Sequence, residues 1–62
     1  MRVKLKEGIF DIIFGLTYKA GVSYVATKRL IDGKEGVEVF YPGSPGGGII
    51  VSPDMVEEVV RR

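Results

Sequence analysis

The side chains that most often perform chemistry at neutral pH are missing from this chain. Its 62 residues include no His and no Cys, so the usual general base and the most reactive nucleophile are both absent. The hydroxyls of Ser23, Ser44 and Ser52 have no evident activating partner in the sequence, and Ser52 is better explained as a helix cap. We therefore expect no catalytic residue, no metal site and no cofactor, so the chain is predicted not to be an enzyme.

Two other patterns suggest chemistry only at first sight. Asp11, Asp32 and Glu35 fall near predicted loops, where paired acids are usually solvated turn residues. The Gly-rich loop 42–48 lacks the Gly-Lys-Ser/Thr ending of a phosphate-binding loop. It also leads into a predicted strand, whereas a phosphate site favours a helix N-terminus. The loop is therefore predicted to be a flexible hairpin tip that, if functional, contacts a partner.

Length and composition predict one small domain covering residues 1–62. A domain of this size rarely gains more than about 3–5 kcal/mol from its core without a disulfide, a metal or a partner. The formal net charge is +1 and charged residues make up 27% of the chain. The apolar-rich stretch 9–16 is interrupted by Asp11 and is too short to cross a membrane. With no secretory signal evident, the expected location is the cytoplasm.

Alternating apolar and polar residues predict strands in several places. These segments are residues 2–6, 22–30 and 37–41, and the continuous apolar run 49–51 is predicted to be a short buried strand. The alternation places Tyr18, Tyr24 and Tyr41 on the inward side. Residues 32–36 predict a second turn, in which Asp32-Gly33 supplies the positive φ angle of a tight connection and Gly36 is a further candidate for one.

The stretch from Gly36 to Ser52 is the clearest fold signal. Two apolar runs flank a loop of Pro, Gly and Ser, a pattern typical of a β-hairpin with a longer loop. Ser52-Pro53-Asp54 then predicts a helix start, with Ser52 as the N-cap. Because Val59-Val60 suits a strand better than a helix, one helical turn followed by a short last strand is the alternative.

Residues 9–16 are ambiguous. Ile9, Ile12, Ile13 and Leu16 have helical spacing, but the segment between Gly8 and Gly15 is short for a helix. We predict an irregular or single-turn element in which Phe10 and Phe14 fill the mouth of a barrel. A short helix is the alternative. A further alternative places Phe10 or Phe14 on the outside, where aromatics favour interfaces.

The order of short strands, Gly-rich turns, a final strand and then Ser-Pro-Asp-Met-Val-Glu-Glu-Val resembles the Src-homology-3-like small barrels. The resemblance covers residues 22–60 and concerns layout, so no ligand-binding residue is carried over. It implies a mainly β fold, a small five-stranded barrel with a short C-terminal helical turn. It also implies binding of peptides, nucleic acids or proteins, with many members assembling through edge strands. The chain has no Trp, a departure from the members that bind proline-rich peptides.

The function predicted from these observations is a non-catalytic interaction module that binds a protein partner, itself, or both. Strand 37–41 and the loop that follows it are the predicted contact elements. Phe40 would lie on the outward face, where aromatics favour interfaces; alternatively the strand phase is off by one and Phe40 is buried. The predicted partner-binding residues are Phe40, Glu38, Tyr41, Pro42, Ser44 and Pro45.

Nucleic-acid binding is the alternative function. Small barrels bind strands by stacking bases on aromatics over a cationic groove. The candidate cations are Arg2, Lys4, Lys6, Lys19, Lys28 and Arg29. Against this hypothesis, the three tyrosines are predicted to point inward, and eight acidic residues nearly balance nine basic ones.

Overall fold

The computed structural model describes residues 1–44 and 48–59. Seven strands and one 3₁₀ turn follow one another along these residues. They are β1 (Arg2–Leu5), β2 (Ile9–Asp11), β3 (Leu16–Tyr18), β4 (Ser23–Ile31), β5 (Lys34–Val39), β6 (Ile49–Val51), the 3₁₀ turn η1 (Pro53–Met55) and β7 (Val56–Val59). The predicted mainly β fold with a short C-terminal helical turn is confirmed.

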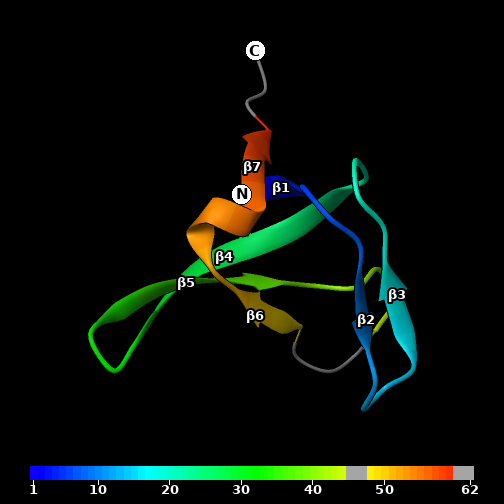
Figure 1. Cartoon of the computed structure of the whole chain (residues 1–62), viewed down its shortest axis with the longest axis horizontal. Coiled ribbons are helices and arrows are strands. Elements are labelled where there is room, and N and C mark those ends of the chain that lie inside the picture. The colour runs from blue at the N-terminus through cyan, green and yellow to red at the C-terminus, as the bar shows by residue number, and fades with distance from the viewer. Residues whose placement is uncertain (45–47, 60–62) are drawn as a thin grey trace.

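The strands form two antiparallel sheets (Figure 1). Five strands lie in the order β6-β5-β4-β1-β7, while β2 and β3 pair only with each other. Over the residues that the structure describes, the five-stranded sheet does not close into a barrel, since β6 and β7 form its two ends. The hairpin of β2 and β3 is joined to the sheet at its base, where the Gly21 N–H donates to the Leu5 carbonyl at 3.1 Å.

The alternating residues of β1 point to opposite faces of the sheet, as predicted. Val3 and Leu5 are almost fully buried, while Lys4 is exposed on the other face. Strand β1 lies between β4 and β7 and bonds to both. Strand β1 is therefore an interior strand of the sheet, with one buried face and a bonded neighbour on each edge.

The Asp32-Gly33 turn is tighter than the sequence suggested. Both residues have positive φ angles, 49° and 77°, as in the two-residue turns that match the twist of paired strands. Ile31 therefore pairs directly with Lys34. As a result, β5 begins at Lys34 and ends at Val39, earlier at both ends than the predicted segment 37–41.

The core is built on the inward residues of five strands. The buried hydrophobic residues are Val3, Leu5, Tyr18, Tyr24, Ala26, Val37, Val39 and Val51. The Tyr18 ring lies 5.5 Å from that of Tyr24 and 5.2 Å from that of Tyr41, between ring centroids. Both arrangements are tilted or edge-on, as aromatic pairs prefer. The inward placement predicted for the three tyrosines is confirmed.

The prediction for residues 9–16 is wrong. The segment belongs to a β-hairpin whose strands pair Ile9 with Tyr18 and Asp11 with Leu16. Since successive strand residues alternate in direction, Phe10 faces away from the core beside Thr17. Phe10 and Phe14 are exposed and fill no barrel mouth.

The C-terminal turn also differs from the prediction in one detail. Ser52 occupies the N-cap position before Pro53, but its side chain makes no capping hydrogen bond. The turn is held instead by backbone bonds, with the Met55 N–H donating to the Ser52 carbonyl at 3.0 Å. Three residues later the chain is extended again in β7, so the alternative of one turn and a last strand is confirmed.

Burial of Tyr18 leads to a first expected result, on stability at high pH. Desolvation, then the charges of Asp11, Tyr24 and Tyr41, raise the pKa of Tyr18 above its usual value near 10. In the interval above pH 10 the folded chain holds a proton that the unfolded chain loses, so the free energy of unfolding falls as pH rises. The stabilisation is complete below about pH 10 and is lost as pH rises towards the folded-state pKa.

Tyr18→Phe keeps the ring and removes the titrating group. We expect the melting temperature of the variant to fall less steeply than that of the wild type above pH 10, with both curves parallel at neutral pH. Thermal unfolding followed by circular dichroism across this range measures both slopes. Equal slopes above pH 10 would show that Tyr18 does not carry the effect.

Candidate protein-interaction surface

The β2–β3 hairpin ends in an apolar tip, which we define as Phe10, Ile12, Ile13 and Phe14. The Asp11 carboxylate closes the turn, since its Oδ1 accepts the N–H groups of Ile13 at 3.0 Å and Phe14 at 3.4 Å. This local bond is typical of Asp in turns. Gly15 completes the turn with a φ of 66°.

All four side chains of the apolar tip are open to solvent. Their exposed fractions are 61% for Phe10, 84% for Ile12, 82% for Ile13 and 66% for Phe14. Single exposed hydrophobic residues are common on protein surfaces, but contiguous ones usually mark a contact site. Four large apolar side chains within five residues therefore form the strongest candidate contact surface in the part of the chain that is described.

The base of the hairpin is firmly attached to the core. Tyr18 is 1% exposed, and Ile9 and Leu16 pack against the buried cluster. The Tyr24 hydroxyl accepts the Lys19 N–H at 2.7 Å, just beyond β3. The hairpin is thus attached through its buried base, and its turn is closed by the Asp11 carboxylate.

The partner-binding residues predicted from the sequence lie elsewhere, around the end of β5. Phe40 is half-buried and lies outside the core cluster, while its N–H donates to the Val25 carbonyl at 2.9 Å. Tyr41 packs on the core, Pro42 is exposed and Ser44 is half-buried. Pro45 lies outside the described residues. Phe40 is therefore neither an exposed aromatic nor a core residue.

Glu38 is committed to contacts within the chain. It lies on the outward face of β5 yet is only 7% exposed. Its Oε1 accepts Arg29 Nε and Nη2, both at 2.6 Å, and its Oε2 accepts the Gly48 N–H at 3.3 Å. The carboxylate thus links β4, β5 and the residue just before β6, a structural role that the sequence did not indicate.

The cations predicted to bind nucleic acid are spread over several surfaces. Arg29 is paired with Glu38, and Arg2 donates to the Ser23 hydroxyl at 2.8 Å. Lys4 lies directly across from Glu57 in the pairing of β1 with β7. The remaining candidates, Lys6, Lys19 and Lys28, are exposed and belong to different segments. The fold does not gather the six into one groove.

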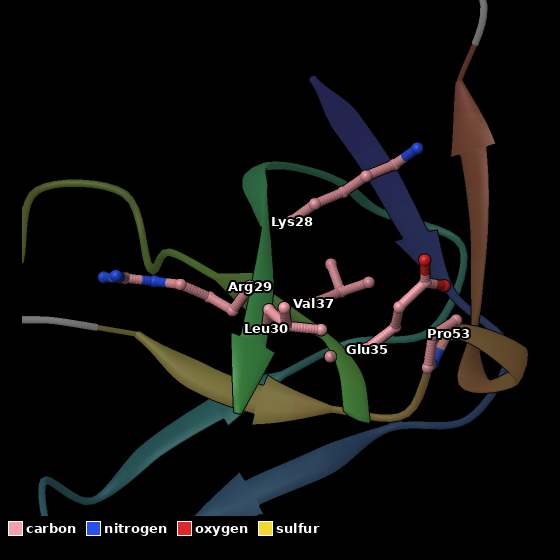
Figure 2. Close-up of a pocket in the computed structure, with 7 residues that line it drawn as sticks. Lys28, Arg29, Leu30, Glu35, Val37 and Pro53 are labelled. Carbon is pink, nitrogen blue, oxygen red and sulfur yellow. The ribbon is translucent and has the colours of Figure 1, made fainter. Parts of the chain in front are cut away.

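A pocket is lined by residues of β4, β5 and η1 (Figure 2). Its volume is about 430 Å³, and its lining includes Leu30, Val37 and Pro53. Lys28 and Glu35 extend beside it, while Arg29 points to the other side of the sheet, towards Glu38. We call this the β4–β5 pocket. Its apolar lining suits an apolar group more than a charged one.

Two other kinds of site have no candidate among the described residues. In residues 1–44 and 48–59, no group of three or more His, Cys, Asp or Glu side chains is placed to hold a metal ion. Among the same residues, no helix has the length and apolar character needed to cross a membrane.

Comparisons with known protein families, with curated proteins and with solved structures find no match.

Exposure of Phe10 or Phe14 was an open alternative, but the apolar tip as a whole was missed because its composition also suits a buried segment. A sequence signal for it does exist: Asp11 and Gly15 flank the turn, and Ile9–Asp11 and Leu16–Tyr18 are equal in length around it. Asp and Gly are typical turn residues. Reading Asp11 as a turn residue would have predicted a hairpin with Ile12, Ile13 and Phe14 at its end.

Proposed function

We propose that this protein is a non-catalytic interaction module that binds a protein partner through the apolar tip of the β2–β3 hairpin. The observation that carries the proposal is the exposure of Phe10, Ile12, Ile13 and Phe14, each more than 60% open to solvent. Burial of apolar surface is the main driving force of protein association. Aromatic residues are moreover enriched in interfaces.

The attachment of the tip supports the same function. Asp11 and Gly15 fix the turn, and Tyr18 anchors the hairpin in the core. A surface that is already in its bound conformation loses less conformational entropy on binding. The exposed side chains are therefore available for contact without a rearrangement of the fold.

We also propose a kinship with the Src-homology-3-like small barrels. The strand order β6-β5-β4-β1-β7, with a 3₁₀ turn directly before the last strand, supports it. Members of that superfamily bind peptides, nucleic acids or protein partners, and many assemble through their edge strands. This kinship is consistent with a binding function.

Nucleic-acid and membrane partners have less support. The candidate cations are dispersed, and the three tyrosines are packed inward instead of offering a stacking surface. A membrane-inserting tip would carry the Asp11 carboxylate towards the lipid, at a cost in free energy. A protein surface can meet the same carboxylate with a hydrogen-bond donor or a cation.

The proposal is tested by photo-crosslinking from the tip. Ile13 is replaced by p-benzoylphenylalanine, and the same replacement at Val25, exposed on β4, is the matched control. In extract of the cells that produce the protein, we expect a discrete protein adduct from position 13 that is absent from position 25. Adding Ile12→Ser and Phe14→Ser to the position-13 probe should abolish the adduct.

Three outcomes would contradict the proposal. If position 13 yields no more adduct than position 25, the tip is not a contact surface. If the chain instead floats with phosphatidylcholine and phosphatidylglycerol vesicles in a Phe14-dependent manner, the tip binds lipid. An adduct with nucleic acid would favour the alternative function.

A further inference from the structure

The molecule carries two complementary apolar features at different places. The apolar tip protrudes from the β2–β3 hairpin, and the β4–β5 pocket lies beside the other hairpin. In Figure 1 these two hairpins lie on opposite sides of the molecule. A chain therefore cannot fill its own pocket with its own tip.

We propose that the partner of the apolar tip is a second copy of this chain, whose β4–β5 pocket receives it. This inference rests on the proposed function, which it extends by naming the partner. The tip and the pocket are different surfaces, so the contact is head-to-tail. Repetition of such a contact gives a ring if the rotation closes and an open filament if it does not.

The pocket is large enough to receive a side chain from another molecule. The pocket volume of about 430 Å³ lies in the range of about 300–1,000 Å³ typical of ligand pockets, which leaves room for the Phe14 ring. Val37 lies beneath, and Leu30 and Pro53 line the pocket. Leu30 is itself 73% exposed, so docking would bury apolar surface on both chains.

The charges favour the pocket over a second tip as the docking surface. A two-fold tip-to-tip contact would bring the Asp11 carboxylates of both chains close together, which is unfavourable at short distance. The pocket offers Lys28 beside its apolar lining. Among the described residues the ion pair is that of Arg29 with Glu38, so Lys28 is free to meet Asp11. Glu35 pairs with Leu30, nearer the Asp32-Gly33 turn than Lys28 lies, so the tip should enter with Asp11 at the Lys28 end of the lining.

Two single substitutions separate the two halves of this contact. Phe14→Asp destroys the tip and leaves the pocket, whereas Leu30→Asp destroys the pocket and leaves the tip. Both side chains are exposed, so both variants should keep the wild-type circular dichroism spectrum. Val25→Asp, on the outward face of β4, is the matched control.

Sedimentation velocity over a concentration series gives the readout. We expect the wild type and Val25→Asp to associate with rising concentration, and each tip or pocket variant to associate about tenfold more weakly or not at all. An equimolar mixture of Phe14→Asp and Leu30→Asp should form a dimer that grows no further. In that mixture one intact tip meets one intact pocket, and the other two surfaces are blocked.

Two results would overturn the inference. If Leu30→Asp associates like the wild type while Phe14→Asp does not, the contact is tip-to-tip. If the wild type stays monomeric at every concentration, the partner is not a second copy. In that second case an adduct from position 13 to a different protein would leave the proposed function standing, whereas the absence of any adduct would reject both.

Discussion

Tyr18→Ala is expected to leave the chain largely unfolded at room temperature. Tyr18 is 1% exposed and lies between the rings of Tyr24 and Tyr41. Truncating a buried aromatic side chain to Ala typically costs about 3–5 kcal/mol. A domain of this size without disulfide or metal has a stability of about 3–5 kcal/mol, so the loss would consume nearly all of it.

The matched control is Phe10→Ala, on the neighbouring strand of the same hairpin. Phe10 is mostly exposed, so its loss should change the free energy of unfolding by less than about 1 kcal/mol. Urea unfolding followed by circular dichroism compares the two. Equal effects would mean that the two aromatics share one environment, contrary to the inward and outward directions found here.

Gly48→Ala is the substitution with the second largest expected effect. A Cβ atom at this position would overlap the carbonyl group of Val39 and lie 3.0 Å from the Phe40 Cα. Backbone atoms cannot move aside as a flexible side chain can, so β5 and β6 would have to separate locally. The Gly48 N–H would then also lose its bond to Glu38. We expect a loss of about 3 kcal/mol, the upper part of the range for overpacking.

Gly8→Ala controls for the general effect of adding a methyl group to a glycine. The nearest atom to a Cβ at Gly8 is the Tyr18 carbonyl oxygen, 3.4 Å away. This is ordinary contact, and the change in stability should stay within about 0.5 kcal/mol. The midpoint of urea unfolding is the measurement. A Gly48→Ala midpoint close to that of Gly8→Ala would mean that the contact between β5 and Gly48 is looser than described.

The regular strands were accessible from the sequence because burial on one face leaves a period of two. Val3 and Leu5 in β1, and Val37 and Val39 in β5, show that period and are buried as it predicts. The same reasoning placed the tyrosines inward. The turn at Asp32-Gly33 was also predicted, because Asp and Gly are typical turn residues. These signals are local, and local signals can be recognised in a single sequence.

The apolar tip could not be recognised by hydrophobicity. Ile12 and Ile13 have the composition of core residues, and the spacing from Ile9 to Leu16 fits a helix as well as a hairpin. Whether such a segment is buried depends on what else covers it, which is a property of the whole fold. The structure leaves it uncovered, and a preference for burial thus led to the wrong prediction.

The role of Glu38 was hidden for a related reason. Its position on an alternating strand correctly predicts an outward direction. Its burial, however, depends on Arg29 in the neighbouring strand and on Gly48 beyond the loop. Contacts between residues distant in sequence leave no periodic pattern, so a residue proposed for a partner proved to be bound within the chain.

The apolar tip is expected to be free surface in the monomer, and methyl NMR tests this exposure most directly. A soluble paramagnetic agent is added at a protein concentration low enough to prevent association, and the relaxation of methyl groups is recorded. The methyl groups of Ile12 and Ile13 are expected to relax much faster than those of Val3 and Val39, which are fully buried. Equal protection of the four residues would mean that the hairpin folds over the core, and the proposed binding surface would not exist.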